Sequence, residues 1–230
     1  MGDLSTALNS KVTTDAGGWR PVKALPPLQY APTVKRGFDF LLALLLLPAI
    51  VPVILCLVLW MRLDGGPGLF GHLRIGKDGR PFRCWKIRTM VPDADQVLAE
   101  LLRSDPLMCA EWAADQKLRQ DPRVTPLGAL LRRTSLDELP QIWNVLVGDM
   151  SLVGPRPVTK DELARYGAVK HSYLSVRPGI TGLWQVSGRN GVGYSARVAL
   201  DEVYCADVTF KQDLKILLKT AGVVLRCTGQ

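Results

Sequence analysis

The chain has 230 residues, enough for one sizeable domain with an added membrane element. Its net charge of +8 favours an anionic partner, but the charges are spread out and no nucleic-acid-binding signature accompanies them. Five cysteines without a CxxC pair, and only two histidines, argue against a disulfide framework, a zinc site and a Ser-His-Asp triad. We therefore expect a reduced, cytosolic setting and no nucleic-acid partner.

The first part of the chain divides into a tail and an apolar segment. Residues 1–34 contain scattered proline, glycine and serine, so we expect a flexible tail without a core of its own. Residues 35–62 include 22 consecutive uncharged positions, from Phe40 to Met61. As a helix these would rise ~33 Å, about one hydrocarbon core. A single spanning helix is the simplest interpretation.

Two features favour a re-entrant helix, which enters and leaves the same leaflet. Pro48 and Pro52 lie around the midpoint of the apolar segment, and each removes a backbone donor. Both flanks are positively charged, whereas positive residues normally mark the cytosolic side. We therefore expect a helix–break–helix at these prolines, with the spanning helix as the alternative. Asp39 is expected to pair with Lys35 or Arg36.

Residues 63–230 are expected to form a domain on the cytosolic face. A hairpin is predicted where Leu69–Arg74 and Pro81–Arg88 flank a Lys-Asp-Gly turn. The final helix is basic and amphipathic, which suits either a lipid surface or an ordinary core position. The expected class is α+β, mostly helical, with a small β-hairpin and interfacial amphipathic helices. Besides the hairpin, we predict one strand, Ile180–Val186, and helices over Ala94–Arg103, Pro106–Leu118, Leu127–Arg133, Gln141–Val147, Asp161–Ser172, Ala196–Tyr204 and Lys211–Leu225.

The adjacent carboxylates Asp137 and Glu138 follow two arginines, Arg132 and Arg133. Ser135-Leu-Asp-Glu138 is also a capping-box pattern, in which Glu138 would bond the Ser135 N–H, and spacing alone favours that interpretation. A functional interpretation is that a helix N-terminus holds a phosphate and that the nearby arginines keep an aspartate ionised, as a nucleophile must be. A divalent cation would offset the repulsion between carboxylate and phosphate.

Three further segments present cations or amide donors. Gly154-Pro-Arg-Pro157 is a rigid turn whose guanidinium matches phosphate oxygens. A glycine-rich stretch between residues 177 and 189 allows close backbone approach. The segment 86–90 follows the hairpin, and each of the three segments would also suit a solvated surface. Their candidate phosphate-binding or nucleotide-binding residues are Lys86, Arg88, Arg156, Arg177, Gln185 and Arg189.

Together these motifs resemble the bacterial sugar transferase family, the monotopic phosphoglycosyl transferases, from about Lys35 to Gln230. The size is similar to that of the short exopolysaccharide-initiating members. The motifs that carry the resemblance are, in order, Lys35-Arg-Gly-Phe-Asp, Val51-Pro-Val-Ile, Lys86-Ile-Arg-Thr-Met, Asp121-Pro-Arg-Val-Thr-Pro-Leu-Gly, Ser135-Leu-Asp-Glu-Leu-Pro-Gln, Gly148-Asp-Met-Ser-Leu-Val-Gly-Pro-Arg-Pro and Arg177-Pro-Gly-Ile-Thr-Gly-Leu-Trp-Gln-Val.

The resemblance implies a reaction in which hexose 1-phosphate passes from a UDP-hexose to polyprenyl (undecaprenyl) phosphate, with release of UMP. It implies a covalent phosphosugar–aspartate at Asp137, assistance by Glu138, a membrane helix broken near Pro52, and Mg²⁺ with Asp137 as a ligand. It further implies phosphate contacts for Lys86, Arg88, Arg132 and Arg156, and nucleotide or sugar contacts for Arg177, Gln185 and Arg189.

The implied location is the cytoplasmic face of the bacterial inner membrane, with phospholipid as a partner and a homo-oligomer as a possible assembly. The sugar stays open among glucose, galactose and N-acetylated hexoses, because no residue can be assigned to a sugar hydroxyl. The alternative function is a non-enzymatic protein, in which a single spanning helix anchors a basic binding domain.

Overall fold

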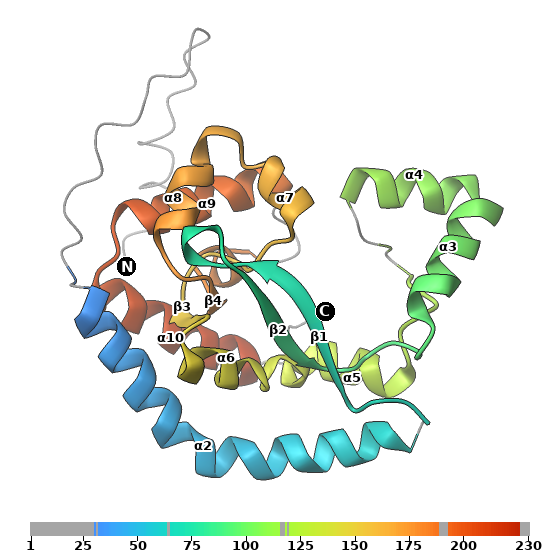
Figure 1. The fold of residues 1–230 in the computed structure, drawn as a ribbon, viewed down its shortest axis with the longest axis horizontal. Coiled ribbons are helices and arrows are strands. Elements are labelled where there is room, and N and C mark those ends of the chain that lie inside the picture. Colours follow the sequence, from blue (N-terminus) through green and yellow to red (C-terminus); the bar gives the residue numbers. More distant parts are fainter. Residues whose placement is uncertain are drawn as a thin grey trace, which may run out of the picture.

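The computed structural model describes residues 30, 32–63, 65–115, 118, 120–188 and 193–225. Nearly all of the predicted tail, and Arg189, lie outside these residues. The described part is mostly helical with two small two-stranded sheets, which confirms the α+β prediction. Figure 1 shows the long helix α2 (Pro32–Arg62) along one edge, with the hairpin inside it and shorter helices beyond.

Helix α2 is long and apolar enough to cross a membrane, by length and composition alone. Its buried residues are Asp39, Ala43, Leu57 and Met61, while most of its other apolar side chains are exposed or half-buried. The predicted break is wrong as an interruption, because the helix continues through both internal prolines. It instead changes direction near its middle (Figure 1), as expected when proline removes a donor without unwinding the following turn.

The buried carboxylate of Asp39 ties the first half of α2 to the core. It accepts hydrogen bonds from Ser151 Oγ at 2.7 Å and from the Leu152 N–H at 3.2 Å. The predicted pairing with a neighbouring cation is therefore wrong, because the carboxylate points inward to these two donors.

The cations beside Asp39 have other partners. Lys35 forms an ion pair with the buried carboxylate of Asp213, 2.5 Å away, on helix α10 (Phe210–Leu225). Arg36 donates to the backbone carbonyls of Val145 and Leu146 at the end of α6 (Gln141–Val147). A cation at a helix C-terminus satisfies carbonyls that lack helical partners. The start of α2 is thus held by charged contacts to two other helices.

The predicted hairpin is confirmed. Strand β1 (Leu69–Ile75) pairs with β2 (Pro81–Ile87) in antiparallel register, and the 3-10 turn η1 (Lys77–Gly79) joins them. The buried Asn144 side chain links β2 to α6, accepting from the Trp85 N–H at 3.0 Å and donating to the Arg83 carbonyl at 2.8 Å. The strand that carries Lys86 is therefore fixed to the helix that follows the carboxylate pair.

A second sheet was only partly predicted. Strand β3 (Ser151–Val153) was missed, and it pairs in parallel with β4 (Gly179–Thr181). The predicted strand Ile180–Val186 is wrong beyond Thr181, since the chain turns into the 3-10 helix η4 (Trp184–Val186). The main apolar core lies around β3, and its fully or nearly fully buried members are Ala43, Cys84, Val145, Met150, Val153, Tyr204, Val208 and Ile216.

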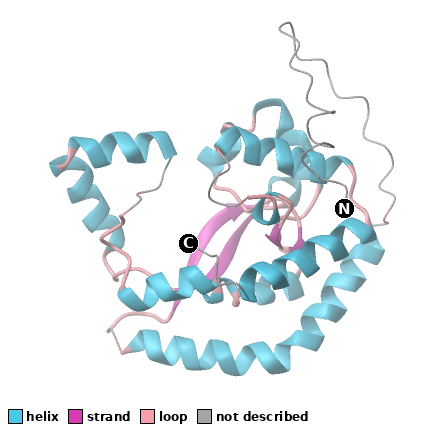
Figure 2. Ribbon diagram, turned by 180° about the vertical axis from the view of Figure 1, so that it is seen from behind, coloured by secondary structure: helices cyan, strands magenta, loops and turns pink. Residues whose placement is uncertain are grey.

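Most predicted helices are confirmed with small shifts at their ends. Helices α3 (Ala94–Ser104) and α4 (Pro106–Asp115) stand apart from the body as a separate arm (Figures 1 and 2). Asp161–Ser172 is not one helix, because Gly167 has a positive φ of 53° and interrupts it. The chain instead forms α7 (Lys160–Ala164), η3 (Gly167–Val169) and α8 (Lys170–Ser175), and the remaining helices are α5 (Pro126–Thr134) and α9 (Tyr194–Ala206).

The last helix, α10, buries one side and exposes another. Ile216 is buried in the main core, whereas Leu214 and Leu218 are 42% and 67% exposed. The core interpretation of this helix is therefore confirmed for its inner side. Contact between its outer side and lipid stays a prediction.

Candidate active site

The two adjacent carboxylates lie in a short 3-10 turn between two helices. Helix α5 ends at Ser135, which has a left-handed backbone with φ 59° and donates its N–H to the Arg132 carbonyl. The turn η2 (Leu136–Glu138) follows and leads into α6. The predicted capping box is wrong, because the Ser135 side chain caps no helix and its backbone instead terminates α5. The turn directs both carboxylates towards β2.

Lys86 on β2 joins the two carboxylates. Its Nζ lies 2.7 Å from Oε1 of Glu138 and 3.7 Å from Oδ2 of Asp137. The Asp137 side chain is only 9% exposed, whereas those of Glu138 and Lys86 are 26% and 30% exposed. Although burial favours the neutral amine, the two carboxylates raise the pKa of Lys86 and keep its ammonium charged. The site therefore places a buried aspartate behind a more accessible ion pair.

Burial raises the pKa of Asp137 to about 6, although Lys86 opposes this shift. The negative charge of Glu138 raises the pKa further, and Arg132 lowers it. The cations favour the ionised carboxylate, as expected, because Lys86 and Arg132 lower the pKa of Asp137, but desolvation outweighs them and leaves that pKa raised. A pKa of about 6 still lies below neutral pH, so the ionised form of Asp137 prevails at pH 7. Such a carboxylate is poorly hydrated and available as a nucleophile.

Arg132 approaches the carboxylates from α5. Its Nε donates to Thr89 Oγ1 at 2.9 Å, and its charge interacts with those of Asp137 and Asp121. Asp121 is in turn held by Arg123, whose Nε and Nη2 lie 2.8 and 2.7 Å from its two carboxylate oxygens. Such a two-point contact fixes both side chains in one plane. The charges of Asp121 and Arg123, both in the Asp121-Pro-Arg motif, therefore act on the guanidinium of Arg132.

Arg156 reaches the same region from the loop after β3. Its positive charge affects Lys86, Arg74 and Glu162, which places it on the Lys86 side of the carboxylate pair. Its guanidinium carbon lies 5.5 Å from the centroid of the Trp184 ring. The structure therefore brings together four of the predicted residues, namely Asp137, Glu138, Lys86 and Arg132, and the charge of Arg156 acts on Lys86.

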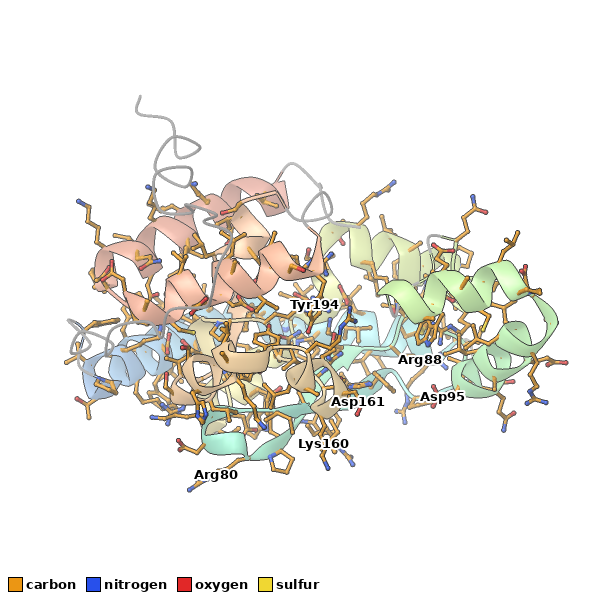
Figure 3. The ribbon with its side chains drawn as sticks, turned by 90° about the horizontal axis from the view of Figure 1, so that it is seen from above. Arg80, Arg88, Asp95, Lys160, Asp161 and Tyr194 are labelled. Carbon is orange, nitrogen blue, oxygen red and sulfur yellow. The ribbon has the colours of Figure 1, made fainter. Side chains whose placement is uncertain are left out.

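Arg88 has other contacts. It is 5% exposed, and its Nη2 donates at 2.8 Å to the Met61 carbonyl near the end of α2, while its Nε and Nη1 have no hydrogen-bond partner. Figure 3 labels Arg88 where the chain passes from the hairpin towards the α3–α4 arm. This contact links α2 to the segment that follows the strand carrying Lys86. Phosphate binding by Arg88 stays a prediction.

Two predicted residues of the glycine-rich stretch, Arg177 and Gln185, donate side-chain hydrogen bonds to backbone carbonyls. Arg177 Nε donates to the Gly148 carbonyl at 2.8 Å, just beyond α6. Gln185 Nε2 donates to the Ile180 carbonyl at 3.0 Å, and its Oε1 is buried without a hydrogen-bond partner. Their roles towards a nucleotide or sugar stay predictions, and Arg189 lies outside the described residues.

The donor set suits magnesium. Within the described ranges, no three His, Cys, Asp or Glu side chains come together as metal ligands. Mg²⁺, however, is commonly bound by one or two carboxylates together with substrate phosphates and water. Asp137 and Glu138 supply two such carboxylates, and Lys86 already occupies a position where a cation is stabilised. These residues therefore fit Mg²⁺ if a phosphate completes its coordination.

Residues 30–227 match the family model described as bacterial sugar transferase. This chain belongs to the bacterial sugar transferase family. The match covers α2, the hairpin and every described residue of the site, so the family's motifs and the observed carboxylate cluster coincide.

Named relatives fall into two groups by length. The chain is 50% identical over 196 residues to the UDP-galactose-lipid carrier transferase of Erwinia amylovora, covering 85% of this chain and 41% of the relative. It is 39% identical to the UDP-glucose:undecaprenyl-phosphate glucose-1-phosphate transferase of Escherichia coli, covering 81% of this chain and 39% of that protein. It thus spans about two-fifths of these longer relatives. In contrast, it is 44% identical to the exopolysaccharide production protein ExoY of Sinorhizobium fredii, covering 95% of this chain and 93% of the relative.

Several residues that shape this bacterial sugar transferase site were not singled out from the sequence. Thr89 and Asp121 lie in motifs that were recognised, but only the fold shows that both face Arg132. Trp184 also lies in a recognised motif, and its contact with Arg156 joins segments 28 residues apart. The sequence did not predict the buried role of Asn144, because an asparagine inside a helical pattern normally indicates an exposed position.

Proposed function

We propose that this protein transfers a hexose 1-phosphate from a UDP-hexose to polyprenyl phosphate and releases UMP. The observation that carries this proposal is the buried Asp137 carboxylate, which has an elevated pKa and adjoins Glu138, Lys86 and Arg132. The family match and the names of the relatives support the same class of reaction. A buried, poorly hydrated carboxylate surrounded by cations suits attack on a phosphorus atom whose oxygens are negatively charged.

In the first step, an Asp137 oxygen attacks the phosphorus that bears the sugar. The bond between that phosphorus and the bridging oxygen breaks, and the electron pair leaves with UMP. Lys86 and Arg132 stabilise the charge that develops on the phosphoryl and bridging oxygens. Arg156 holds the donor phosphates by hydrogen bonds from its guanidinium. The product is a phosphosugar–aspartate.

In the second step, an oxygen of the lipid phosphate attacks the same phosphorus. The Asp137–phosphorus bond breaks, the carboxylate is regenerated, and the sugar is joined to the lipid through a diphosphate. Glu138, 26% exposed and held by Lys86, is placed to orient the incoming phosphate or to take a proton from it. Mg²⁺ held by Asp137 and Glu138 would supply additional neutralisation of phosphate charge.

The position of α2 is consistent with a lipid acceptor. Its C-terminal half packs Leu57 and Met61 against Ile87 and Leu131, which lie beside Lys86 and Arg132. A lipid phosphate at the membrane surface would therefore be close to the carboxylate pair. We propose that α2 is re-entrant and that the domain lies on the cytoplasmic face, because positive residues flank the helix on both sides.

The direct test is UMP release by the full chain in lipid nanodiscs, with a panel of UDP-sugars and with or without polyprenyl phosphate and Mg²⁺. Asp137→Asn should lower turnover by at least about a thousandfold, because the amide cannot act as the nucleophile. Asp161→Asn is the matched control, since this carboxylate on α7 is exposed and is not paired with Lys86. No UMP from any donor, or near-normal release by Asp137→Asn without deamidation, would contradict the proposal.

Topology is tested separately by tag accessibility in oriented vesicles. A re-entrant α2 places a tag at residue 1 on the same side as a tag at residue 230. Tags on opposite sides would show a spanning helix and would support the anchored-protein alternative if UMP release were also absent.

A further inference from the structure

We propose that Trp184 is a positioning residue, which fixes the guanidinium of Arg156 for the phosphates of the sugar-nucleotide donor. This inference rests on the proposed function, in which Arg156 contacts those phosphates. Trp184 itself would touch neither the donor nor the reacting atoms.

The backbone fixes the distance between the two segments. The Gly154 N–H donates to the Thr181 carbonyl and the Gly179 N–H donates to the Pro155 carbonyl, each at 2.9 Å. A Cβ at Gly179 would lie 2.1 Å from the Gly154 nitrogen, so only glycine permits this approach. The turn that carries Arg156 is therefore attached to the strand that leads into Trp184.

The indole ring provides a rigid surface at that point. Trp184 is 7% exposed and lies in η4, which packs between helices α9 and α10. The Arg156 guanidinium carbon lies 5.5 Å from the ring centroid, within the range of a cation–π contact. Trp184 Nε1 is buried and has no hydrogen-bond partner. No hydrogen bond therefore orients the polar edge of the ring, and its electron-rich face is the part that contacts the guanidinium.

This contact leaves the hydrogen-bonding edge of Arg156 for an anion. Among the ion pairs of the described residues, none joins a carboxylate to Arg156. The buried Asp201 carboxylate accepts a hydrogen bond from the Tyr166 hydroxyl at 2.9 Å, and burial raises its pKa while the charge of Arg156 opposes that rise. An arginine that is stacked on an aromatic ring loses less rotational freedom when it binds a phosphate.

A second guanidinium adds positive charge beside the same ring. The Arg197 guanidinium carbon, on α9, lies 5.0 Å from the Trp184 centroid. Two like charges repel when they are drawn together, and the indole quadrupole offsets part of that repulsion. The positive charge beside the ring therefore favours the donor's diphosphate over a neutral sugar.

The inference is tested by kinetics of UMP release for Trp184→Leu, Trp184→Phe, Arg156→Ala and the double variant Trp184→Leu/Arg156→Ala. Trp184→Leu should raise the KM for the UDP-sugar on the order of tenfold with a smaller change in kcat, and Trp184→Phe should restore most of the loss. Arg83→Ala is the control, because this exposed arginine makes a similar contact with Trp85 at 5.7 Å on the hairpin. It should leave the KM unchanged.

The double variant decides between positioning and packing. If Trp184 acts through Arg156, the double variant should be no worse than Arg156→Ala alone. Multiplicative losses, or a lower kcat with an unchanged KM, would overturn the inference. Equilibrium binding of UDP-sugar to Asp137→Asn chains, with and without Trp184→Leu, gives a second readout that needs no turnover. UMP release by the wild-type chain reports on the proposed function itself, so the two failures are distinguishable.

Discussion

The ammonium group of Lys86 lies 2.7 Å from the carboxylate of Glu138, on the more accessible side of the buried nucleophile candidate. Strand β2 and turn η2 supply these two residues, which are 52 positions apart in the chain. The same ammonium lies 3.7 Å from Asp137. The Lys86 ammonium therefore interacts with both carboxylates, so a change in any of the three alters the charge state of the others.

The first prediction concerns the pH dependence of turnover. UMP release should fall as the pH drops through about 6, because Asp137 has a raised pKa of about 6 and its protonated form is not a nucleophile. Lys86→Met should move this acid limb to higher pH, since Lys86 lowers the pKa of Asp137. Glu138→Gln should move it to lower pH, since Glu138 raises that pKa. Initial rates between pH 5 and 8 measure both shifts.

The control for these shifts is Lys211→Met, which removes an exposed cation from α10. It should leave the midpoint of the acid limb unchanged. Shifts of the same sign for Lys86→Met and Glu138→Gln would contradict the assignment of the limb to Asp137.

The second prediction concerns the support of Arg132. Thr89→Val keeps the shape of the side chain but removes the oxygen that accepts from Arg132 Nε at 2.9 Å. We expect kcat/KM to fall on the order of tenfold, because the loss of a charged hydrogen bond is worth about 1.5–3 kcal/mol and leaves the guanidinium less constrained. Thr134→Val is the matched control, since its hydroxyl bonds only carbonyls of its own helix. Equal losses in the two variants would exclude a specific role for Thr89.

The sequence predicts the parts of this fold that depend on local chemistry. The hairpin follows from its Lys-Asp-Gly turn, and α6 ends at Gly148, which has a positive φ of 95°. Strand β3 has only three residues, all buried, and so lacks the alternation that marks a strand. It forms because β4, almost thirty residues later, pairs with it.

The candidate site shows the same limit. The residue types of the carboxylate pair and its cations could be read from the motifs, whereas their partners could not. Ser135 has the sequence of a helix N-cap, yet it terminates the preceding helix in a left-handed conformation. The left-handed conformation lets Glu138 pair with Lys86, which lies on a strand distant in sequence. No local sequence pattern predicts this pairing. The raised pKa of Asp137 likewise depends on burial by the whole fold.

The third prediction concerns the attachment of helix α2. Asp39→Ala removes the acceptor of Ser151 Oγ and of the Leu152 N–H, and it leaves both buried donors without this partner. We expect a loss of about 1–3 kcal/mol in the free energy of unfolding, measured by thermal denaturation in detergent. Leu45→Ala on the same helix is the control, because that side chain is 74% exposed and should have little effect in micelles. An unchanged midpoint for Asp39→Ala would show that the carboxylate does not hold α2 to β3.

The fourth prediction concerns the packing of α5 against the end of β2. A Cβ at Gly128 would lie 2.0 Å from the Thr89 carbonyl oxygen, so Gly128→Ala must separate the helix from the strand. We expect a loss of about 3 kcal/mol in stability and a fall in kcat/KM, because the same movement separates Arg132 from Thr89. Gly222→Ala on α10 is the matched control, since nothing lies within 4 Å of its added Cβ, and it should be neutral or slightly stabilising. A destabilised Gly128→Ala chain with normal kcat/KM would show that the position of Arg132 does not depend on this contact.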